Sequence, residues 1–351
     1  MPRLKRADCS GPGIRRVRRG RGFSYVDDIT GERIDDPETI ERITDLVIPP
    51  AWKEVWVCPF PNGHIQATGL DEAGRKQYLY HDRWREHRDR EKFEKVLELA
   101  EELPRVRRRL KRDLKRRGLV RERVLACSIR LLDLGFFRIG SEQYAEENET
   151  YGLATLRKRH VSFERGLIVF SYEAKGSQQR VQTIDDAEIV PIVRALKRRQ
   201  GGGHELLAYR QNGGWRDVRS DQINDYLKEV AGSEFTAKDF RTWNATVLAA
   251  VALALAEDGE TSKAARKRVA TQAVKAVSEY LGNTPAVCRA SYIDPRVFDR
   301  YRSGLTIAGA LEQLGQVDEP GEPAHQGPIE EAVLDLIEEK HGPAPELDLI
   351  A

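Results

Sequence analysis

The feature that most restricts the fold of this 351-residue chain is a change of hydrophobic pattern near residue 90. Between residues 23 and 90, short aromatic and β-branched runs are separated by turn sequences such as Pro49-Pro50 and Pro61-Asn62-Gly63. Such runs predict a small, mainly β N-terminal domain. From Glu91 onward the apolar residues recur at the helical period, so a larger, mainly α domain is expected over residues 91–315.

The second domain also contains a short β region within its helices. Apolar and polar residues alternate over 161–163, 167–172 and 180–184, which predicts a three-stranded hairpin sheet with Lys175 at the tip of a tight turn. Pro104 is expected to interrupt the first helix. The fold class predicted is therefore α+β, with helices at 91–103, 105–117, 120–137, 186–199, 220–231, 237–257, 260–281 and 294–303.

Charge is distributed unevenly along the chain, although the net charge is only +2. Residues 317–351 carry a net charge of −9, and residues 1–316 carry +11. Basic residues gather in 1–22, expected to be a flexible arm, and in 105–117. Either cluster alone is also typical of a solvated helix face, but two together favour a polyanionic partner. The acidic tail, residues 316–351, is expected to be disordered apart from a short amphipathic segment at 329–340.

Several classes of protein are disfavoured. The longest apolar run, Val247–Ala256, has ten residues and is too short to span a bilayer, and no N-terminal signal is apparent, so a cytoplasmic protein without membrane contact is expected. The histidines and four cysteines lack metal-ligand spacing, and no phosphate-binding loop for ATP is present. We therefore expect no metal, no nucleotide and no other cofactor.

A tyrosine and several separate cations suggest chemistry on a phosphodiester. Tyr292 lies nine residues after Asn283, and upstream lie Arg138 near the end of an apolar helix, Lys175 in the hairpin turn and Arg241 in a helix. A phenolic hydroxyl can attack phosphorus and become a phosphotyrosine, while cations hold the phosphate oxygens. Each residue alone has an ordinary explanation: a core tyrosine, a helix-terminal cation, an exposed turn lysine or a surface ion pair.

Four local motifs follow one another along the chain: Gln77–His81, Arg138–Gly140 with Glu147–Leu153, Lys238–Asn244 and Leu281–Tyr292. In this order they resemble the type IB DNA topoisomerases in the compact form found in bacteria and poxviruses. The resemblance covers about residues 23–310. It implies a tyrosine-recombinase-like catalytic domain and a monomer that clamps double-stranded DNA and relaxes supercoils without ATP.

The resemblance also implies a role for each catalytic residue. Tyr292 matches the nucleophile that forms a 3′-phosphotyrosyl intermediate. Arg138 and Arg241 match the arginines that bind the non-bridging phosphate oxygens, and Lys175 matches the general acid for the 5′ oxygen. Asn283 stands where the poxvirus branch usually has histidine. Its amide can donate a hydrogen bond to phosphate but cannot transfer a proton, so only a role in transition-state binding is expected.

Further residues match positions that face DNA in this family. In the N-terminal domain a glutamine can read a base edge, and tyrosines can contact phosphate or sugar. Tyr78 and Tyr80 are also consistent with sharing one face of a strand for purely structural reasons. The residues expected to contact DNA are Gln77, Tyr78, Tyr80, His81, Tyr144 and Lys238.

Two other functions remain open from the sequence. A tyrosine recombinase or integrase would share the chemistry but requires four assembled protomers and usually has an all-helical first domain. A non-catalytic DNA-binding protein would need only the basic clusters, and Tyr292 would be dispensable. The expected location is the cytoplasm, in association with the nucleoid, where the acidic tail would compete weakly with DNA.

Overall fold

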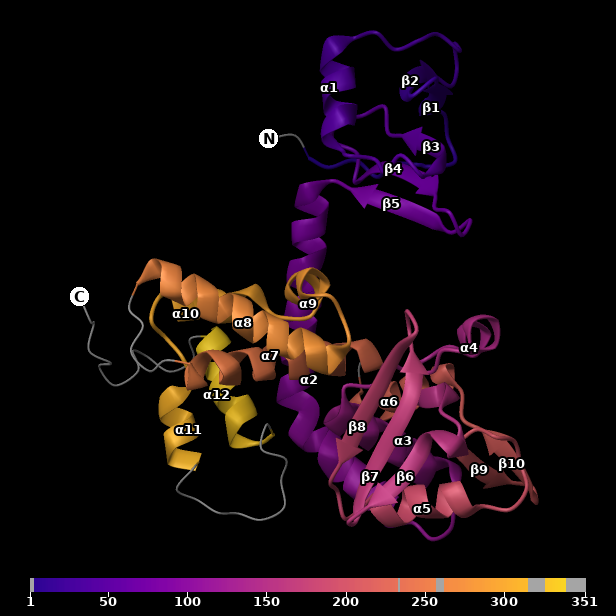
Figure 1. Ribbon diagram of the computed structural model, residues 1–351, viewed down its shortest axis with the longest axis vertical. Helices are drawn as coiled ribbons and strands as arrows, with labels where there is room; N and C mark the ends of the chain where they lie inside the picture. The colour runs from indigo at the N-terminus through magenta and orange to yellow at the C-terminus, as the bar shows by residue number, and fades with distance from the viewer. Residues whose placement is uncertain (1–2, 233, 257–261, 315–325, 339–351) are drawn as a thin grey trace. The chain divides into compact units, whose positions relative to one another are not determined.

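The chain forms two compact units that meet between Lys92 and Phe93, so the boundary lies within helix α2 (Asp82–Leu114). The computed structural model describes residues 3–232, 234–256, 262–314 and 326–338. Helices and small antiparallel sheets are combined along the chain, which confirms the α+β class (Figure 1). None of the described helices is long and apolar enough to cross a membrane.

The first unit is built on a five-stranded antiparallel sheet in the order β2-β1-β3-β4-β5. Helix α1 (Pro37–Asp45) contributes Ile43 to a small core that also contains Ile14, Val55, Val57 and Ala67. Asp36 caps this helix by accepting a hydrogen bond from the Thr39 N–H. The strands are β1 (Ile14–Arg19), β2 (Gly22–Asp27), β3 (Lys53–Val57), β4 (Ile65–Leu70) and β5 (Lys76–Tyr80).

The prediction of a flexible arm over residues 1–22 is wrong for its second half. Residues 14–19 form β1, which lies between β2 and β3 in the sheet, and Ile14 pairs with Val57. The Arg16 guanidinium donates hydrogen bonds to the carbonyls of Pro49 and Trp52, at 3.1 and 2.6 Å. The run of arginines suggested a solvated, flexible segment. An arginine in a strand can instead direct its guanidinium toward backbone carbonyls, as Arg16 does here.

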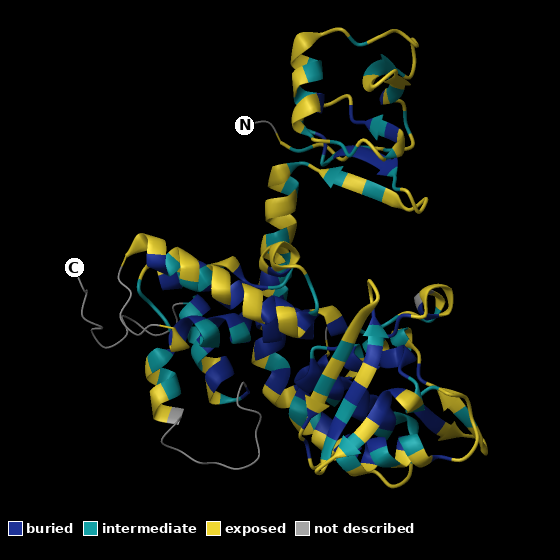
Figure 2. Ribbon diagram, in the orientation of Figure 1, coloured by how far each residue is buried: buried dark blue, intermediate teal, exposed yellow. Residues whose placement is uncertain are grey.

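The second unit is organised around helix α3 (Arg121–Gly135), which is buried from Val124 onward except at Arg130 (Figure 2). It contacts α6 (Ser220–Ala231) and α7 (Ala237–Leu255). Apolar side chains on successive turns of α3 face several helices at once, which explains why its sequence is apolar almost all round. The strongly apolar segment predicted as a core helix is thus confirmed.

The predicted three-stranded sheet is present and antiparallel, in the order β6-β7-β8. Its strands are β6 (Val161–Glu164), β7 (Leu167–Ala174) and β8 (Gln178–Ile184). Alternate residues of β7, namely Ile168, Phe170, Tyr172 and Ala174, face the core. Lys175 lies in the turn that follows, where Gly176 has φ +79° and Ser177 has φ +53°.

A second hairpin was not predicted. Strands β9 (Ala208–Gln211) and β10 (Gly214–Asp217) are joined by Asn212 and Gly213, with φ angles of +50° and +81°. Asn-Gly is the preferred sequence for a two-residue hairpin turn that needs two positive φ angles. The remaining helices are α4 (Glu142–Asn148), α5 (Val190–Arg198), α8 (Lys263–Leu281), α9 (Pro285–Ser291), α10 (Pro295–Arg302), α11 (Ala308–Leu314) and α12 (Pro328–Glu338).

Pro104 does not interrupt the helix, contrary to the prediction. Helix α2 passes through Pro104 without a break, and its full length is 33 residues. Pro104 is exposed, whereas Leu103 and Val106 beside it are buried in the core of the second unit. Proline removes one backbone hydrogen bond, and burial of the neighbouring apolar residues on one face offsets that loss.

Four arginines of the basic cluster at 105–117 bind partners within the protein. Arg109 and Arg116 each pair with the buried carboxylate of Asp113, at 3.0 and 2.8 Å. Arg107 pairs with Asp133 at 2.8 Å, and Arg105 donates to a backbone carbonyl of α6. The charge pattern alone suggested a surface for polyanions, but Arg105 and Arg107 join α2 to neighbouring helices, and Arg109 and Arg116 bind Asp113 near the end of α2 itself.

The acidic tail is structured where it is described. Helix α12 buries Ile329, Val333 and Ile337 in the core of the second unit. Its Glu330 pairs with Arg107 at 2.5 Å and accepts a hydrogen bond from the Trp243 indole at 2.8 Å. The amphipathic segment predicted within the tail is thus a helix that packs into the core of the second unit. Residues 315–325 and 339–351 lie outside the described residues.

Candidate active site

The candidate site is centred on the C-terminal end of α8. Gly282 takes the left-handed conformation, with φ +62°, and the N–H of Asn283 donates to the carbonyl of Ser278 at 3.1 Å. Glycine suits this position because it reaches positive φ without steric cost. The last carbonyls of a helix lack partners within the helix and carry a partial negative charge. We call residues 279–283 the α8 carbonyl turn.

Arg241 on α7 reaches this turn from the protein interior. It is only 4% exposed, and it donates hydrogen bonds to the Leu281 carbonyl at 2.9 Å, to the Asn283 side-chain oxygen at 3.0 Å and to the carbonyl of Phe136. Its Nε–H is buried and has no hydrogen-bond partner among the described residues. A buried donor without an acceptor is costly, so this atom indicates a place for an additional acceptor.

The electrostatic environment of Arg241 is also unusual. Burial, together with the nearby Arg138 charge, lowers the pKa of Arg241 to about 10, and Tyr292 opposes this effect. The group stays protonated at neutral pH. Its guanidinium carbon lies 5.3 Å from the centre of the Tyr292 ring, so the cation and the candidate nucleophile are in direct contact.

Arg138 approaches the α8 carbonyl turn from the segment that follows α3. One of its terminal nitrogens donates to the Gly282 carbonyl and to the Asn283 side-chain oxygen, both at 3.0 Å. Arg138 lies three residues beyond the end of α3, which argues against the alternative that it is only a cation stabilising that helix terminus. The backbone here is fixed, because the N–H of Leu153 donates to the Arg138 carbonyl at 2.8 Å.

Two glycines allow this arrangement. Gly140 has φ +82°, and a Cβ atom on it would lie 2.9 Å from the Gly152 Cα. A Cβ atom on Gly152 would lie 2.7 Å from the Arg138 carbonyl oxygen. Both distances are shorter than real Cβ contacts, so the two segments approach this closely only as glycines. The two halves of the second motif therefore act together to position Arg138.

Asn283 joins the two arginines. Its Oδ1 accepts from Arg138 and Arg241, each at 3.0 Å. Because guanidinium groups only donate, the amide oxygen must face them, and the Nδ2 donors are directed elsewhere. The side chain thus has a fixed orientation and retains two donors for an anion.

Tyr292 is held between α9 and α10. Its N–H donates to the Cys288 carbonyl at 3.0 Å, and the Asp294 N–H donates to Thr246 Oγ1 at 3.1 Å. Thr246 belongs to α7, the helix that carries Arg241. One rigid helix therefore determines the positions of both Arg241 and the segment that contains Tyr292.

The cluster keeps its positive charge. Within the described ranges, no carboxylate forms an ion pair with Arg138 or Arg241. Burial raises the pKa of nearby Tyr172 to about 12 despite these arginines, so its phenol is neutral. Two adjacent guanidinium groups with neutral partners provide a site for an anion such as a phosphodiester.

A fourth residue at this turn was not predicted. Arg180 on β8 donates to the carbonyl of Glu279 at 2.7 Å and to that of Tyr280. Its partner across the sheet is Tyr172 on β7. The only sequence signal was its place in the alternating pattern of β8, which put it on the same face as Gln182 and Ile184.

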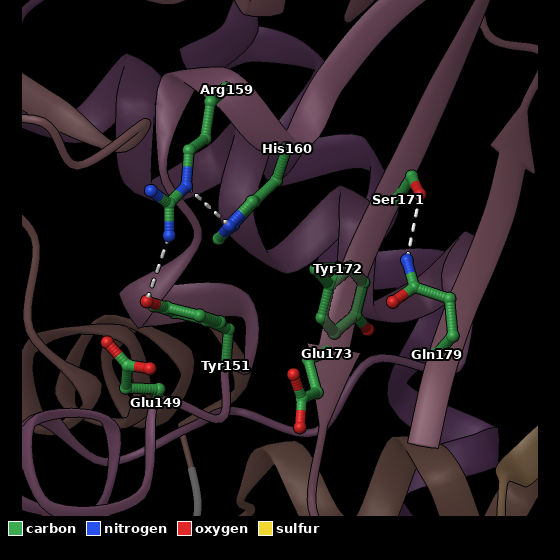
Figure 3. Close-up of a pocket in the computed structure, with 8 residues that line it drawn as sticks. All are labelled: Glu149, Tyr151, Arg159, His160, Ser171, Tyr172, Glu173 and Gln179. Carbon is green, nitrogen blue, oxygen red and sulfur yellow. Dashed lines mark hydrogen bonds between the residues drawn. The ribbon is translucent and has the colours of Figure 1, made fainter. Parts of the chain in front are cut away.

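A polar pocket of about 230 Å³ lies on the three-stranded sheet (Figure 3). In it the Arg159 side chain donates to the Tyr151 hydroxyl at 3.4 Å. None of the five predicted catalytic residues lines it. No group of three or more histidine, cysteine or acidic side chains that could hold a metal ion occurs in the described part of the chain. The lining residues are Glu149, Tyr151, Arg159, His160, Ser171, Tyr172, Glu173 and Gln179.

The predicted DNA-facing residues of the first unit fall into two groups. Tyr78 and Tyr80 are 42% and 38% exposed and stack on one face of β5, with ring centres 6.0 Å apart. Gln77 points to the other face and donates to Asp71 at 2.9 Å. His81 accepts from the Arg83 N–H at 3.2 Å and so caps α2.

The other two predicted contacts lie in the second unit. Lys238 is exposed in the first turn of α7, where a helix N-terminus favours anions. Tyr144 belongs to α4, but its side chain lies outside the described residues.

Comparison with known proteins identifies the class to which this fold and site belong. Residues 81–314 match the family model described as "Eukaryotic DNA topoisomerase I, catalytic core", and residues 22–71 match "Bacterial DNA topoisomerase IB, N-terminal domain". The chain therefore belongs to the type IB DNA topoisomerases and is an enzyme of the type I class.

Individual relatives agree with this assignment. DNA topoisomerase 1B of Acanthamoeba polyphaga mimivirus is 31% identical over 297 residues, which cover 83% of this chain and 88% of the relative. DNA topoisomerase I of Monkeypox virus is 20% identical over 74% of this chain and 77% of its own length. DNA topoisomerase 1 of Schizosaccharomyces pombe matches over 45% of this chain and 19% of its own.

The glycine contact yields a test of how Arg138 is positioned. We expect Gly152→Ala to push the Arg138 segment away from the α8 carbonyl turn and to slow DNA cleavage by about a hundredfold, the usual cost of a misplaced catalytic group. Gly309→Ala is the control, because a Cβ atom there has no neighbour within 4 Å. Single-turnover cleavage measures both; equal rates for the two variants would contradict this account.

Proposed function

We propose that this protein relaxes supercoiled DNA by a reversible single-strand break in which Tyr292 becomes linked to the DNA. The observation that carries the proposal is the convergence of Arg138, Arg241 and Asn283 beside Tyr292, with a buried Arg241 donor that lacks an acceptor. A non-bridging oxygen of a phosphodiester would satisfy that donor and the adjacent positive charge.

In the cleavage step, the Tyr292 hydroxyl oxygen attacks phosphorus and its proton is lost to water. The bond between phosphorus and the 5′ oxygen breaks, which leaves a 3′-phosphotyrosyl linkage. Lys175 donates a proton to the departing 5′ oxygen, because an alkoxide is a poor leaving group. Arg138, Arg241 and the Asn283 amide bind the non-bridging oxygens as charge develops on them.

The reverse reaction reseals the strand. The phosphotyrosine conserves the energy of the broken phosphodiester, so religation requires no ATP. Between the two steps the free 5′ end rotates about the intact strand and releases superhelical tension. This cycle uses side chains of the protein and water, and none of its steps requires a metal ion.

The first unit supplies a second contact with duplex DNA in this proposal. The exposed pair Tyr78 and Tyr80, with Lys76 on the same face of β5, suits sugar and phosphate contacts. Gln77 would have to give up its hydrogen bond to Asp71 before it could bind a base edge. We further propose a tyrosine-recombinase-like catalytic domain and a monomer that clamps DNA in the cytoplasm, in association with the nucleoid.

The geometry of Asn283 gives a graded prediction. We expect Asn283→Ala to slow cleavage by only about ten- to a hundredfold, because both arginines keep backbone carbonyl partners. Asn283→His should retain activity. Asn283→Asp should be slower than Asn283→Ala, because its carboxylate would pair with both guanidinium groups and repel phosphate.

The same single-turnover cleavage assay ranks these variants. Loss of activity in Asn283→Ala as complete as that in Tyr292→Phe would show that the amide is indispensable. An Asn283→Asp enzyme as active as Asn283→Ala would show that positive charge at this cluster is not what matters.

The proposed function is tested by plasmid relaxation in EDTA without ATP. We expect wild-type protein to relax both negatively and positively supercoiled plasmid, since rotation about a nick releases either sign. Tyr292→Phe, which lacks only the nucleophilic oxygen, should relax neither while still binding DNA. Relaxation that needs a divalent metal or ATP, or that survives in Tyr292→Phe, would contradict the proposal.

A further inference from the structure

Arg180 occupies a place between two parts of the site that are distant in sequence. Its side chain comes from β8, five residues after Lys175, and ends at the carbonyls of Glu279 and Tyr280. Figure 1 shows the end of α8 beside β8. These bonds join the hairpin that carries Lys175 to the α8 carbonyl turn that carries Asn283.

The surroundings suit a permanent contact of this kind. The C-terminal carbonyls of a helix attract cations, and two donors of one planar guanidinium reach two successive carbonyls. Gly282 leaves room for the guanidinium, since a Cβ atom there would lie 3.1 Å from an Arg180 nitrogen. Arg180 is partly buried and faces the same side of the sheet as Tyr172, its cross-strand partner.

A connection at this point controls the hairpin turn. Lys175 is exposed at the start of a turn where Gly176 and Ser177 have positive φ, so its location depends on how the strands on either side of the turn are held. The first two residues of β8, Gln178 and Gln179, are exposed as well. Arg180 is therefore the first residue after the turn that is anchored to the helical part of the site.

We propose that Arg180 is a positioning residue: it ties the β7–β8 hairpin to the α8 carbonyl turn and thereby places Lys175 to protonate the 5′ oxygen. This inference rests on the proposed function. It assigns Arg180 the two carbonyls as its partners and no contact with phosphate. Loss of Arg180 should therefore impair proton donation more than attack by Tyr292.

A change of leaving group separates these two effects. When sulfur replaces the bridging 5′ oxygen at the cleavage site, the bond between phosphorus and sulfur breaks and a thiolate leaves. A thiolate needs no proton from a general acid, because a thiol is a much stronger acid than an alcohol. A defect that arises only from a misplaced Lys175 should disappear with this substrate.

The experiment compares single-turnover cleavage of two duplexes, with oxygen or sulfur at one site that the wild-type enzyme cleaves. For Arg180→Ala we expect a loss of about ten- to a hundredfold with oxygen and a rate within about threefold of wild type with sulfur. Arg180→Lys, which keeps one donor for the carbonyls, should lie between wild type and Arg180→Ala with oxygen. Lys175→Ala should show the same pattern more strongly.

Val181→Ala is the matched control, because Val181 is exposed on the opposite face of the same strand. It should cleave both duplexes like wild type. An equal loss with both duplexes for Arg180→Ala, or no loss with either, would overturn the inference. If Arg180→Ala does not fold, Arg180→Lys is used instead, and its loss of rate with the oxygen duplex is compared with its loss with the sulfur duplex. A wild-type enzyme that forms no covalent adduct would instead refute the proposed function.

Discussion

The site depends on hydrogen bonds from three arginines to the carbonyl oxygens at the end of α8. Arg180 binds the carbonyls of residues 279 and 280, Arg241 binds that of residue 281, and Arg138 binds that of residue 282. Three guanidinium groups from β8, α7 and the segment after α3 are thus gathered on one helical turn. Each charged hydrogen bond of this type contributes roughly 1.5–3 kcal/mol.

This means of holding arginines preserves their charge. A carboxylate would bind a guanidinium more strongly, but it would neutralise the cation that a phosphodiester needs. Backbone carbonyls and the Asn283 amide supply acceptors without a full negative charge. The contrast lies within the same chain, where Arg107, Arg109 and Arg116 pair with carboxylates that neutralise their charge.

Much of the fold could be predicted from the sequence, because its periodicities are strong. The change from β to helical pattern, the buried α3 and the β6–β8 hairpins follow directly from where the apolar residues fall. The failures came where another interaction outweighed the local signal. The arginine-rich sequence of β1 predicted a flexible arm, but Arg16 binds backbone carbonyls and the segment forms a strand. At Pro104 a helix break was expected, but burial of the neighbouring apolar residues outweighed it.

The candidate site could be predicted only in part. Tyr292, Arg138, Arg241 and Asn283 were found from motifs, and the structure brings these four together. No motif indicated Arg180, because its role comes from a contact between residues about 100 positions apart in the sequence. Similarly, the need for Gly140 and Gly152 follows from the approach of two backbone segments, which a sequence pattern does not show.

The most direct test of the central claim is to identify the residue that becomes linked to DNA. A duplex from which the short downstream fragment, with its new 5′-hydroxyl end, dissociates after cleavage would trap the intermediate. Mass spectrometry of the digested protein would then locate the attached nucleotide. We predict a nucleotide joined through its 3′ phosphate to Tyr292, and no adduct in Tyr292→Phe. An adduct on another residue, or one joined through a 5′ phosphate, would contradict the account.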